Sequence, residues 1–254
     1  MLRSRIIPCL LIHNGGLVKT INFKDHKYVG DPLNAVKIFN EKNADELVVL
    51  DIDASVSHRE PNYELIKKLA NECRMPLCYG GGVKSVEHFE KIIELGVEKI
   101  AISSSAIQNP ALIKDASSIV GNQSVVVILD LKKRPFRDKY DVYIHNAKEK
   151  INKDALSLIK EFESLGAGEI VINSIDNDGK MQGYNIDLIK KIKNQIHTPL
   201  TVLGGAGSLE DFSDIIKSIG TIGCAAGSLF VFKGKYRAVL INYPSPEEKD
   251  KITL

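Results

Sequence analysis

The stretch GGVKSVEHF at residues 81–89 recurs as GGAGSLEDF at residues 204–212, 123 positions further along the chain. A second match has nearly the same spacing, because LDID at residues 50–53 is echoed by IDND at residues 175–178. Two copies of one pattern, each covering about half of the chain, indicate an internal duplication. Whatever unit the first half forms, the second half is expected to form again.

Short apolar runs alternate with amphipathic segments in both halves. The expected strands are residues 6–12, 46–52, 77–80, 99–102, 125–131, 169–172, 200–203 and 221–225. Helical patterns follow the first seven strands, at residues 32–42, 63–73, 85–95, 110–120, 153–165, 186–196 and 209–219. This alternation predicts a parallel sheet covered by helices, and two (βα)4 halves predict an α/β fold, the (βα)8 TIM barrel. A doubly wound open sheet is the alternative, but it gives the matched halves no geometric reason.

The predicted barrel comprises residues 1–254 as a single domain, with half-repeats at about 1–121 and 122–243 and a tail from 244 to 254. The eighth unit is atypical, because β-branched residues and prolines between 233 and 246 argue against a long closing helix. A short helix at most is expected there, followed by a mobile charged tail from 247 to 254.

Two long loops, at residues 13–28 and 133–150, follow the predicted ends of the first and fifth strands and should overhang the site. The first contains NGG at 14–16 and then Lys19, which indicates either a mobile lid or a plain β-turn.

Composition is that of an ordinary soluble protein, with 44% hydrophobic residues, 26% charged residues and a formal net charge of +2. It gives no reason to expect a nucleic-acid or membrane partner. Without a signal-peptide pattern or a long apolar run, the chain is expected to be cytoplasmic. The cysteines are expected to be reduced and mostly buried, and no metal or cofactor is expected. They are Cys9, Cys73, Cys78 and Cys224.

Glycines and hydroxyl residues follow matched strands in the two halves. Glycine lets backbone N–H groups approach an anion closely, and the loops after strands seven and eight of TIM barrels commonly hold phosphate. The sequence therefore predicts two phosphate cradles and a substrate with a phosphate at each end. The first cradle is Gly81, Gly82, Ser103 and Ser104, and the second is Gly204, Gly205, Gly227 and Ser228.

Carboxylates also end several predicted strands. Asp51, Asp176 and Asp178 occupy matched positions after strands two and six, where they either accept hydrogen bonds from substrate hydroxyls or cap the strand ends. Asp130 ends the fifth strand, and the repeat pairs it with Leu11. Because leucine cannot titrate, a facing acid and base are not both present.

Together these motifs resemble the cyclase subunit of imidazole glycerol phosphate synthase, a (βα)8 barrel of histidine biosynthesis. The matching stretches, within residues 5–232, are RIIPCL at 5–10, GGG at 80–82, Asp130, SIDNDG at 174–179, GGAG at 204–207 and AGS at 226–228. The resemblance implies a glutaminase partner at the N-terminal face, whose ammonia crosses the barrel core to a bisphosphorylated substrate. Lys19, Asp178 and Gly179 join the cradles as candidate substrate-binding residues.

In that family the ammonia entrance is ringed by an Arg, a Glu, a Lys and a second Glu, which correspond here to Arg5, Glu46, Lys99 and Glu169. Each begins strand one, two, four or six, on the face opposite the cradles. The four charges predict an ammonia gate, with a purely structural salt-bridge ring as the alternative.

The chain departs from the family at the chemistry. Two aspartates at the ends of strands one and five are the family's acid and base, and here Leu11 replaces the first. Ser103 and Ser104 also replace an Asn-Thr pair.

The segments FKGK at 232–235 and AVLINYP at 238–244 are similar to bacterial paralogues of surface-polysaccharide loci. That similarity implies a barrel that guides ammonia to a separate amidotransferase, which converts a sugar acetamido group to an acetamidino group. The alternatives are a working cyclase in which Lys19 or Lys132 assists Asp130, and a non-catalytic scaffold that activates the glutaminase.

Overall fold

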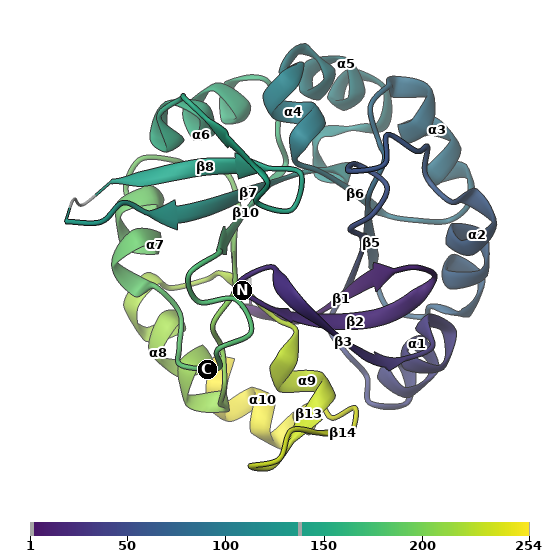
Figure 1. Ribbon diagram of the computed structural model, residues 1–254, viewed down its shortest axis with the longest axis vertical. Coiled ribbons are helices and arrows are strands. Elements are labelled where there is room, and N and C mark those ends of the chain that lie inside the picture. The colour runs from purple at the N-terminus through teal and green to yellow at the C-terminus, as the bar shows by residue number, and fades with distance from the viewer. Residues whose placement is uncertain (1–2, 137–138, 254) are drawn as a thin grey trace.

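The computed structural model describes residues 3–136 and 139–253, and its centre is a closed ring of eight parallel strands (Figure 1). The ring strands are β1 (Arg5–His13), β4 (Leu47–Asp51), β5 (Leu77–Gly80), β6 (Lys99–Ile102), β7 (Val125–Lys133), β10 (Glu169–Ser174), β11 (Leu200–Leu203) and β12 (Gly223–Ala226). Each pairs in parallel with its neighbours, and the β12–β1 and β7–β10 pairs complete the ring. The predicted (βα)8 TIM barrel is confirmed.

Seven helices surround the ring at the predicted positions. They are α1 (Pro32–Glu41), α2 (Tyr63–Glu72), α3 (Val86–Glu94), α5 (Ala111–Val120), α6 (Ala155–Ser164), α7 (Ile186–Lys193) and α8 (Leu209–Ile219), with the short α4 (Ser104–Gln108) and 3-10 helix η1 (Asn122–Ser124) between β6 and β7.

The duplication extends to the residues that start the helices. Asp31 and Asp154, 123 residues apart, each accept a hydrogen bond from an N–H group of the first helical turn. Asn62 and Asn185, also 123 residues apart, do the same for α2 and α7. Such side-chain caps satisfy backbone donors that have no partner inside the helix.

Alternation along the strands divides the core into two compartments. Outward side chains such as Val127 and Leu129 pack against the helices, and inward ones such as Val126 and Ile128 fill the barrel interior. Because successive residues of a strand face opposite sides, the same alternation turns Asp130 inward at the end of β7. The inward residues Ile7 and Cys9 place Leu11 inward at the end of β1 in the same way.

The two long segments predicted to be loops are instead antiparallel hairpins. β2 (Gly16–Ile21) and β3 (Lys24–Gly30) extend β1, and β8 (Tyr140–Ile144) and β9 (Glu149–Ile151) extend β7. Asn14 and Gly15 form the turn into β2 with positive φ angles of 50° and 79°, as tight hairpins require. The loop prediction was wrong, because both segments pair with ring strands that run beyond the barrel.

The chain after β12 contains the short helix α9 (Ser228–Val231) and then, where a short helix at most was predicted, a small hairpin of β13 (Phe232–Lys233) and β14 (Ala238–Val239). The prediction of a mobile tail was wrong for the described residues, which form the helix α10 (Pro246–Thr253) and pack against α8. Ser245 and Glu248 form a reciprocal capping pair at its start, with N–H donors bonded at 3.3 and 2.8 Å. Leu254 lies outside the described residues.

Buried contacts hold this segment to the ring. Tyr243 donates its hydroxyl to the Ile6 carbonyl at 2.8 Å and accepts the Asp45 N–H at 3.1 Å. Lys249 forms an ion pair with Asp45 at 2.7 Å, and the Ile252 side chain is buried. The segment therefore occupies part of the outer layer beside β1.

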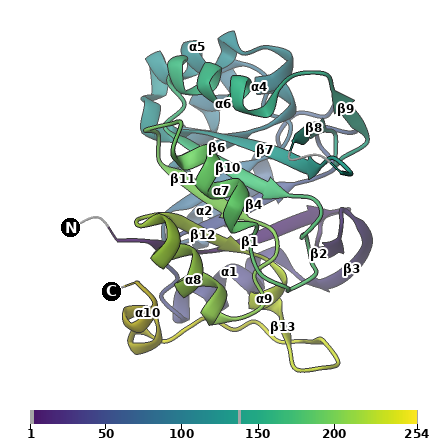
Figure 2. The ribbon, with the colours of Figure 1, turned by 90° about the vertical axis from the view of Figure 1, so that its left-hand side faces the viewer.

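The arrangement gives the barrel two different ends. In Figure 2 the hairpins β2–β3 and β8–β9 lie at one end and α10 at the other. No helix of the described chain is long and apolar enough to cross a membrane. All four cysteines are free thiols, of which Cys9, Cys78 and Cys224 are buried and Cys73 is half-buried.

Candidate functional site at the barrel mouth

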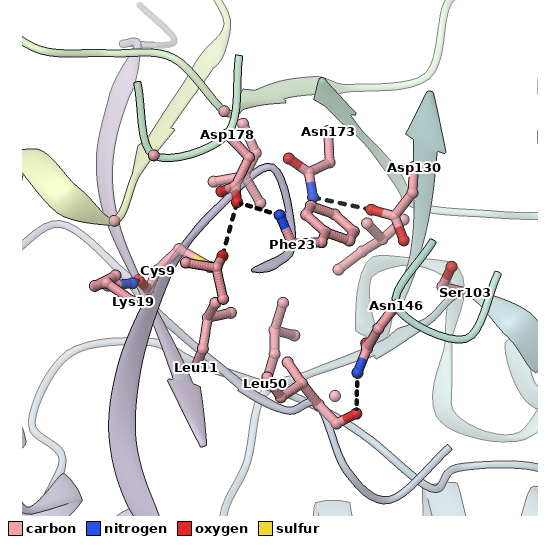
Figure 3. A pocket seen from close by; sticks show the side chains of 18 of the residues that line it. Cys9, Leu11, Lys19, Phe23, Leu50, Ser103, Asp130, Asn146, Asn173 and Asp178 are labelled. Atoms are coloured by element: carbon pink, nitrogen blue, oxygen red, sulfur yellow. Dashed lines mark hydrogen bonds between the residues drawn. The ribbon is translucent and has the colours of Figure 1, made fainter. Parts of the chain in front are cut away.

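A pocket enclosing about 1180 Å³ of empty space, partly open to solvent, lies at the C-terminal ends of the ring strands (Figure 3). All but one of the predicted cradle residues line it, and so do the other predicted catalytic and substrate-binding residues apart from Asp176. These are Lys19, Asp51, Gly81, Ser103, Ser104, Asp130, Asp178, Gly179, Gly204, Gly205, Gly227 and Ser228. The exception in the cradles, Gly82, lines an adjoining pocket of about 490 Å³. The fold therefore gathers both sequence halves around one space.

Asp130 lies on the polar side of this pocket. Asn173 Nδ2, on the neighbouring strand β10, donates to Asp130 Oδ1 at 2.9 Å. Burial raises the pKa of Asp130 to about 7, and the nearby Asp178 carboxylate acts in the same direction, against the hydrogen bond from Asn173. Near neutral pH such a group can accept or donate a proton. Leu11 and Leu50 form an apolar wall across the pocket (Figure 3).

The β2–β3 hairpin is fastened over the mouth by Asp178. Its carboxylate accepts the Thr20 hydroxyl at 2.7 Å and the Phe23 N–H at 3.1 Å, and the Phe23 ring points into the pocket (Figure 3). Burial raises the pKa of Asp178, against these hydrogen bonds and the charge of Lys19. Asp178 is thus a structural anchor as well as a pocket residue.

Lys19 is buried on β2 and lies beside the second of the two predicted phosphate cradles. Its ammonium group donates to the Cys9 carbonyl, and a Cβ atom on Gly227 would lie 2.5 Å from Nζ. Burial lowers the pKa of Lys19, although the Asp178 carboxylate opposes this. Lys19, the cation in the first of the two predicted loops, is therefore packed against the second cradle.

The first cradle is built on backbone that requires glycine. Gly81 has φ of +126°, and a Cβ atom there would lie 2.5 Å from the Asp51 carbonyl oxygen. Ser104 Oγ accepts the His145 N–H at 3.3 Å. Ser103 Oγ is buried and has no hydrogen-bond partner in the part of the chain that the structure describes. An anion that accepted a hydrogen bond from the Ser103 hydroxyl would give this hydroxyl the partner that it lacks.

The second cradle has a basic neighbour that sequence reasoning missed. Arg237, between β13 and β14, donates through Nη2 to the Gly179 carbonyl at 3.1 Å and to Ser228 Oγ at 3.4 Å. Its guanidinium group lies over the Phe232 ring, 4.8 Å from the ring centre. The atypical eighth unit thereby places a positive charge behind Ser228. No sequence pattern indicated this, because the contact depends on how the hairpin folds back.

Two predicted acceptors for substrate hydroxyls accept hydrogen bonds from the backbone. Asp51 Oδ1 accepts the N–H groups of Asp53 and Ala54 at 3.0 and 3.2 Å, although the residue lines the pocket. Asp176 Oδ2 accepts the Lys133 N–H at 2.7 Å. The capping alternative describes both carboxylates.

Asn173 was missed because the strand was predicted to end at Ile172. Val171 faces the barrel interior, and strand alternation then turns Asn173 inward too. Within residues 3–136 and 139–253, no group of three or more His, Cys, Asp or Glu side chains is placed to hold a metal ion.

The four predicted gate residues form one partly buried ring of charge at the opposite end of the barrel. Arg5 contacts Glu46, and its Nη2 lies 2.7 Å from Glu169. Lys99 Nζ lies 3.0 Å from Glu46 and 2.8 Å from Glu169. Burial by itself would raise the pKa of Glu169, but Arg5 and Lys99 outweigh it and hold that pKa below its usual value. Every charge in the ring is therefore paired with both opposite charges.

A narrow space, the inner cavity, lies in the barrel interior between the ring and the mouth pocket. Glu46, Glu169 and Thr201 line its polar side, and most of its other lining is aliphatic. Cys9, Ile128 and Leu203 line both this cavity and the mouth pocket. The barrel core therefore contains adjoining spaces between its two ends.

Comparison with known proteins gives consistent matches. A family model described as histidine biosynthesis protein matches residues 5–237. A Vibrio vulnificus protein, provisionally named imidazole glycerol phosphate synthase subunit hisF3, is 57% identical over 251 residues, which are 99% of this chain and 96% of that protein. A Leptospira borgpetersenii protein, provisionally named subunit HisF of that synthase, is 58% identical over 252 residues, 99% of each chain. The Lactococcus lactis imidazole glycerol phosphate synthase subunit HisF is 41% identical over 230 residues, 91% of this chain and 89% of that protein.

Proposed function

The chain belongs to the histidine biosynthesis protein family, among the HisF-like cyclase subunits of imidazole glycerol phosphate synthase, and we propose that its barrel passes ammonia from a glutaminase partner to the mouth pocket. The partner would dock on the N-terminal face, around the charge ring. The substrate in the pocket would carry a phosphate at each end, one in each cradle.

The observation that carries this proposal is the sequence of spaces from the charge ring to Asp130. The charge ring lies at the end of the core opposite the mouth pocket, and most side chains that line the inner cavity next to it are aliphatic. Neutral ammonia can cross such a lining without the desolvation cost that an ammonium ion would meet. Movement of Lys99, whose side chain is about one-fifth exposed, would open the ring.

We propose further that the ammonia serves a sugar modification, in which a separate amidotransferase converts an acetamido group to an acetamidino group. Two features of this chain support that proposal. Leu11 leaves Asp130 without a facing carboxylate, and the segment from Phe232 to Pro244 is similar to paralogues of surface-polysaccharide loci. Loss of one acid–base group costs roughly 10²–10⁴ in rate, which disfavours the cyclase reaction.

A working cyclase in histidine biosynthesis is the second candidate. The charge ring, both cradles and Asp130 are in place for it, and the Lactococcus lactis relative is named for that synthase. In that case Asp130 would transfer protons alone or with Lys19, which lines the same pocket.

The experiment is to purify the barrel with its glutaminase partner and to measure glutamine hydrolysis and turnover of the histidine-pathway substrate. We expect the barrel to raise glutaminase activity, the wild type to turn over that substrate far below ordinary cyclase rates, and Leu11→Asp to increase the rate. An unchanged glutaminase activity would contradict the ammonia-delivery proposal. Ordinary turnover by the wild type, with growth of a histidine auxotroph, would instead support the cyclase.

A further inference from the structure

Asn173 carries a buried acceptor that the fold leaves without a partner. The residue is 8% exposed, and its Nδ2 is used by the hydrogen bond to Asp130. Oδ1 is buried and has no hydrogen-bond partner among the described residues. Burying an acceptor without a partner is unfavourable, so a ligand that donates a hydrogen bond to Asn173 Oδ1 would stabilise this site.

The residue next to this atom is a glycine, so no side chain covers it from that side. Gly204, on the next strand's loop, has φ of +89°, and a Cβ atom there would lie 2.9 Å from Asn173 Oδ1. Any other residue at position 204 would place its side chain against the acceptor. Both Gly204 and Asn173 line the mouth pocket, so the acceptor lies at the wall of that pocket.

Asn173 and Asp130 form a pair directly above the inner cavity. They are register partners on adjacent parallel strands, β10 and β7. Two residues earlier on the same strands, Val171 and Ile128 line the inner cavity. Anything that moves up the core along these strands therefore meets the pair on entering the mouth pocket.

The chemistry of the pair selects a hydrogen-bond donor. The amide Oδ1 accepts hydrogen bonds, an ionised carboxylate only accepts them, and the facing wall of Leu11 and Leu50 offers neither donors nor acceptors. A small group with several N–H bonds matches this asymmetry better than an anion or an apolar group. Figure 3 shows the two polar side chains on one side of the pocket and the two leucines across from them.

We propose that Asn173 Oδ1 and the Asp130 carboxylate together bind ammonia or an ammonium-type N–H donor where the barrel core opens into the mouth pocket. Asn173 has two roles here, because it orients Asp130 through Nδ2 and contacts the nitrogen through Oδ1. Arrival of that nitrogen through the core rests on the proposed function, but the binding itself does not. A primary amine of a substrate is the other source of the same chemistry.

The test reads the pKa of Asp130 in the whole wild-type chain by ¹³C-carboxyl NMR, with the signal assigned by Asp130→Asn. Titrations are run in ammonium, methylammonium, potassium and tetramethylammonium chloride at equal ionic strength. Other titratable groups line the same pocket and are followed where resolved, namely Cys9, Lys19, His26, Asp51, His145 and Asp178.

We expect saturating ammonium to lower the pKa of Asp130 by about 1 relative to tetramethylammonium, because a bound cation favours the ionised carboxylate. Potassium has the charge but no N–H groups, so its effect should be smaller. Equal effects of potassium and ammonium would overturn the proposal. A larger effect of methylammonium than of ammonium would identify a substrate amine as the better ligand.

Two variants test the role of Asn173. Asn173→Leu should abolish the ammonium-specific change, whereas the exposed control Asn152→Leu should leave it intact. If Asn173→Leu does not fold, Asn173→Asp retains the size and acceptor of the side chain and should strengthen the response. An ammonium response that persists in Asn173→Leu, or that disappears in Asn173→Asp, would show that Asn173 does not contact the nitrogen.

Delivery from the partner is measured separately, with amide-¹⁵N-glutamine and the assembled complex. An ammonium-specific pKa change without ¹⁵N delivery would contradict the proposed function and leave the binding site standing. Delivery without any ammonium-specific change would contradict the binding site and leave the proposed function standing.

Discussion

Replacement of Glu169 by glutamine should destabilise the barrel more than loss of a surface charge does. Glu169 is 5% exposed and accepts hydrogen bonds from Arg5 at 2.7 and 3.3 Å and from Lys99 at 2.8 Å. In Glu169→Gln the side-chain size is kept, but Arg5 and Lys99 share the single carboxylate of Glu46. Removing one partner of a buried ion pair costs about 3–5 kcal/mol. We expect about 3 kcal/mol, because the amide oxygen can still accept one hydrogen bond.

The assay is urea denaturation at pH 7, followed by circular dichroism, with the free energy of unfolding obtained by linear extrapolation. Glu161→Gln, at an exposed position of α6, is the matched control and should change stability by less than about 0.5 kcal/mol. Lys99→Met tests the coupling, because two neighbours in one network should show an interaction energy of about 0.5–3 kcal/mol in a double-mutant cycle.

The pH dependence of stability is a second test of the contribution of Glu169. The pKa of Glu169 is held below its ordinary value of 4.5, because Arg5 and Lys99 outweigh the effect of burial. Its contribution to stability is therefore present above pH 4.5 and is lost as the pH falls through the folded-state pKa. The difference between wild type and Glu169→Gln should be full at pH 7 and shrink in acid. A difference below about 1 kcal/mol at pH 7, typical of an exposed pair, or one that does not shrink in acid, would refute the argument.

Three further substitutions test other parts of the structure. Gly81→Ala should lower the free energy of unfolding, measured by urea denaturation, by at least about 2 kcal/mol more than Gly220→Ala does. Both positions have positive φ, but the new Cβ atom would lie 2.5 Å from a backbone carbonyl oxygen at position 81 and in open space at position 220. Equal losses would show that the collision at position 81 is relieved. Tyr243→Phe should cost about 1–3 kcal/mol in the same assay, because it leaves two buried backbone groups unpaired; an unchanged stability would mean that the segment before α10 is not fixed to the ring. Asp130→Asn should match the wild type in stability near pH 4 but be more stable than the wild type above pH 7, by roughly 1–3 kcal/mol. The reason is that the buried Asp130 side chain is favourable only in its protonated form, and this contribution to wild-type stability is lost as the pH rises through the Asp130 pKa of about 7. Parallel stability curves for the two proteins would contradict the raised pKa.

The sequence by itself determined the barrel and the side of the barrel that holds the site. Strand and helix periods are local properties of burial, so each of the eight ring strands and seven helices could be predicted from its own residues. The repeat of 123 residues then supplied the symmetry, and the helix caps Asp31 and Asp154 follow it too. Because the strands are parallel, residues after their C-terminal ends had to meet at one mouth.

Tertiary structure alone decided which atoms those residues meet. Asp51 and Asp130 both end ring strands, but Asp51 accepts two backbone N–H groups whereas Asp130 meets Asn173 across a strand pair. Pairing of the hairpins, docking of α10 and the approach of Arg237 to Ser228 depend in the same way on partners far away in the chain. Sequence periodicity reports whether a side chain is buried, and only the folded chain determines which atoms it meets there.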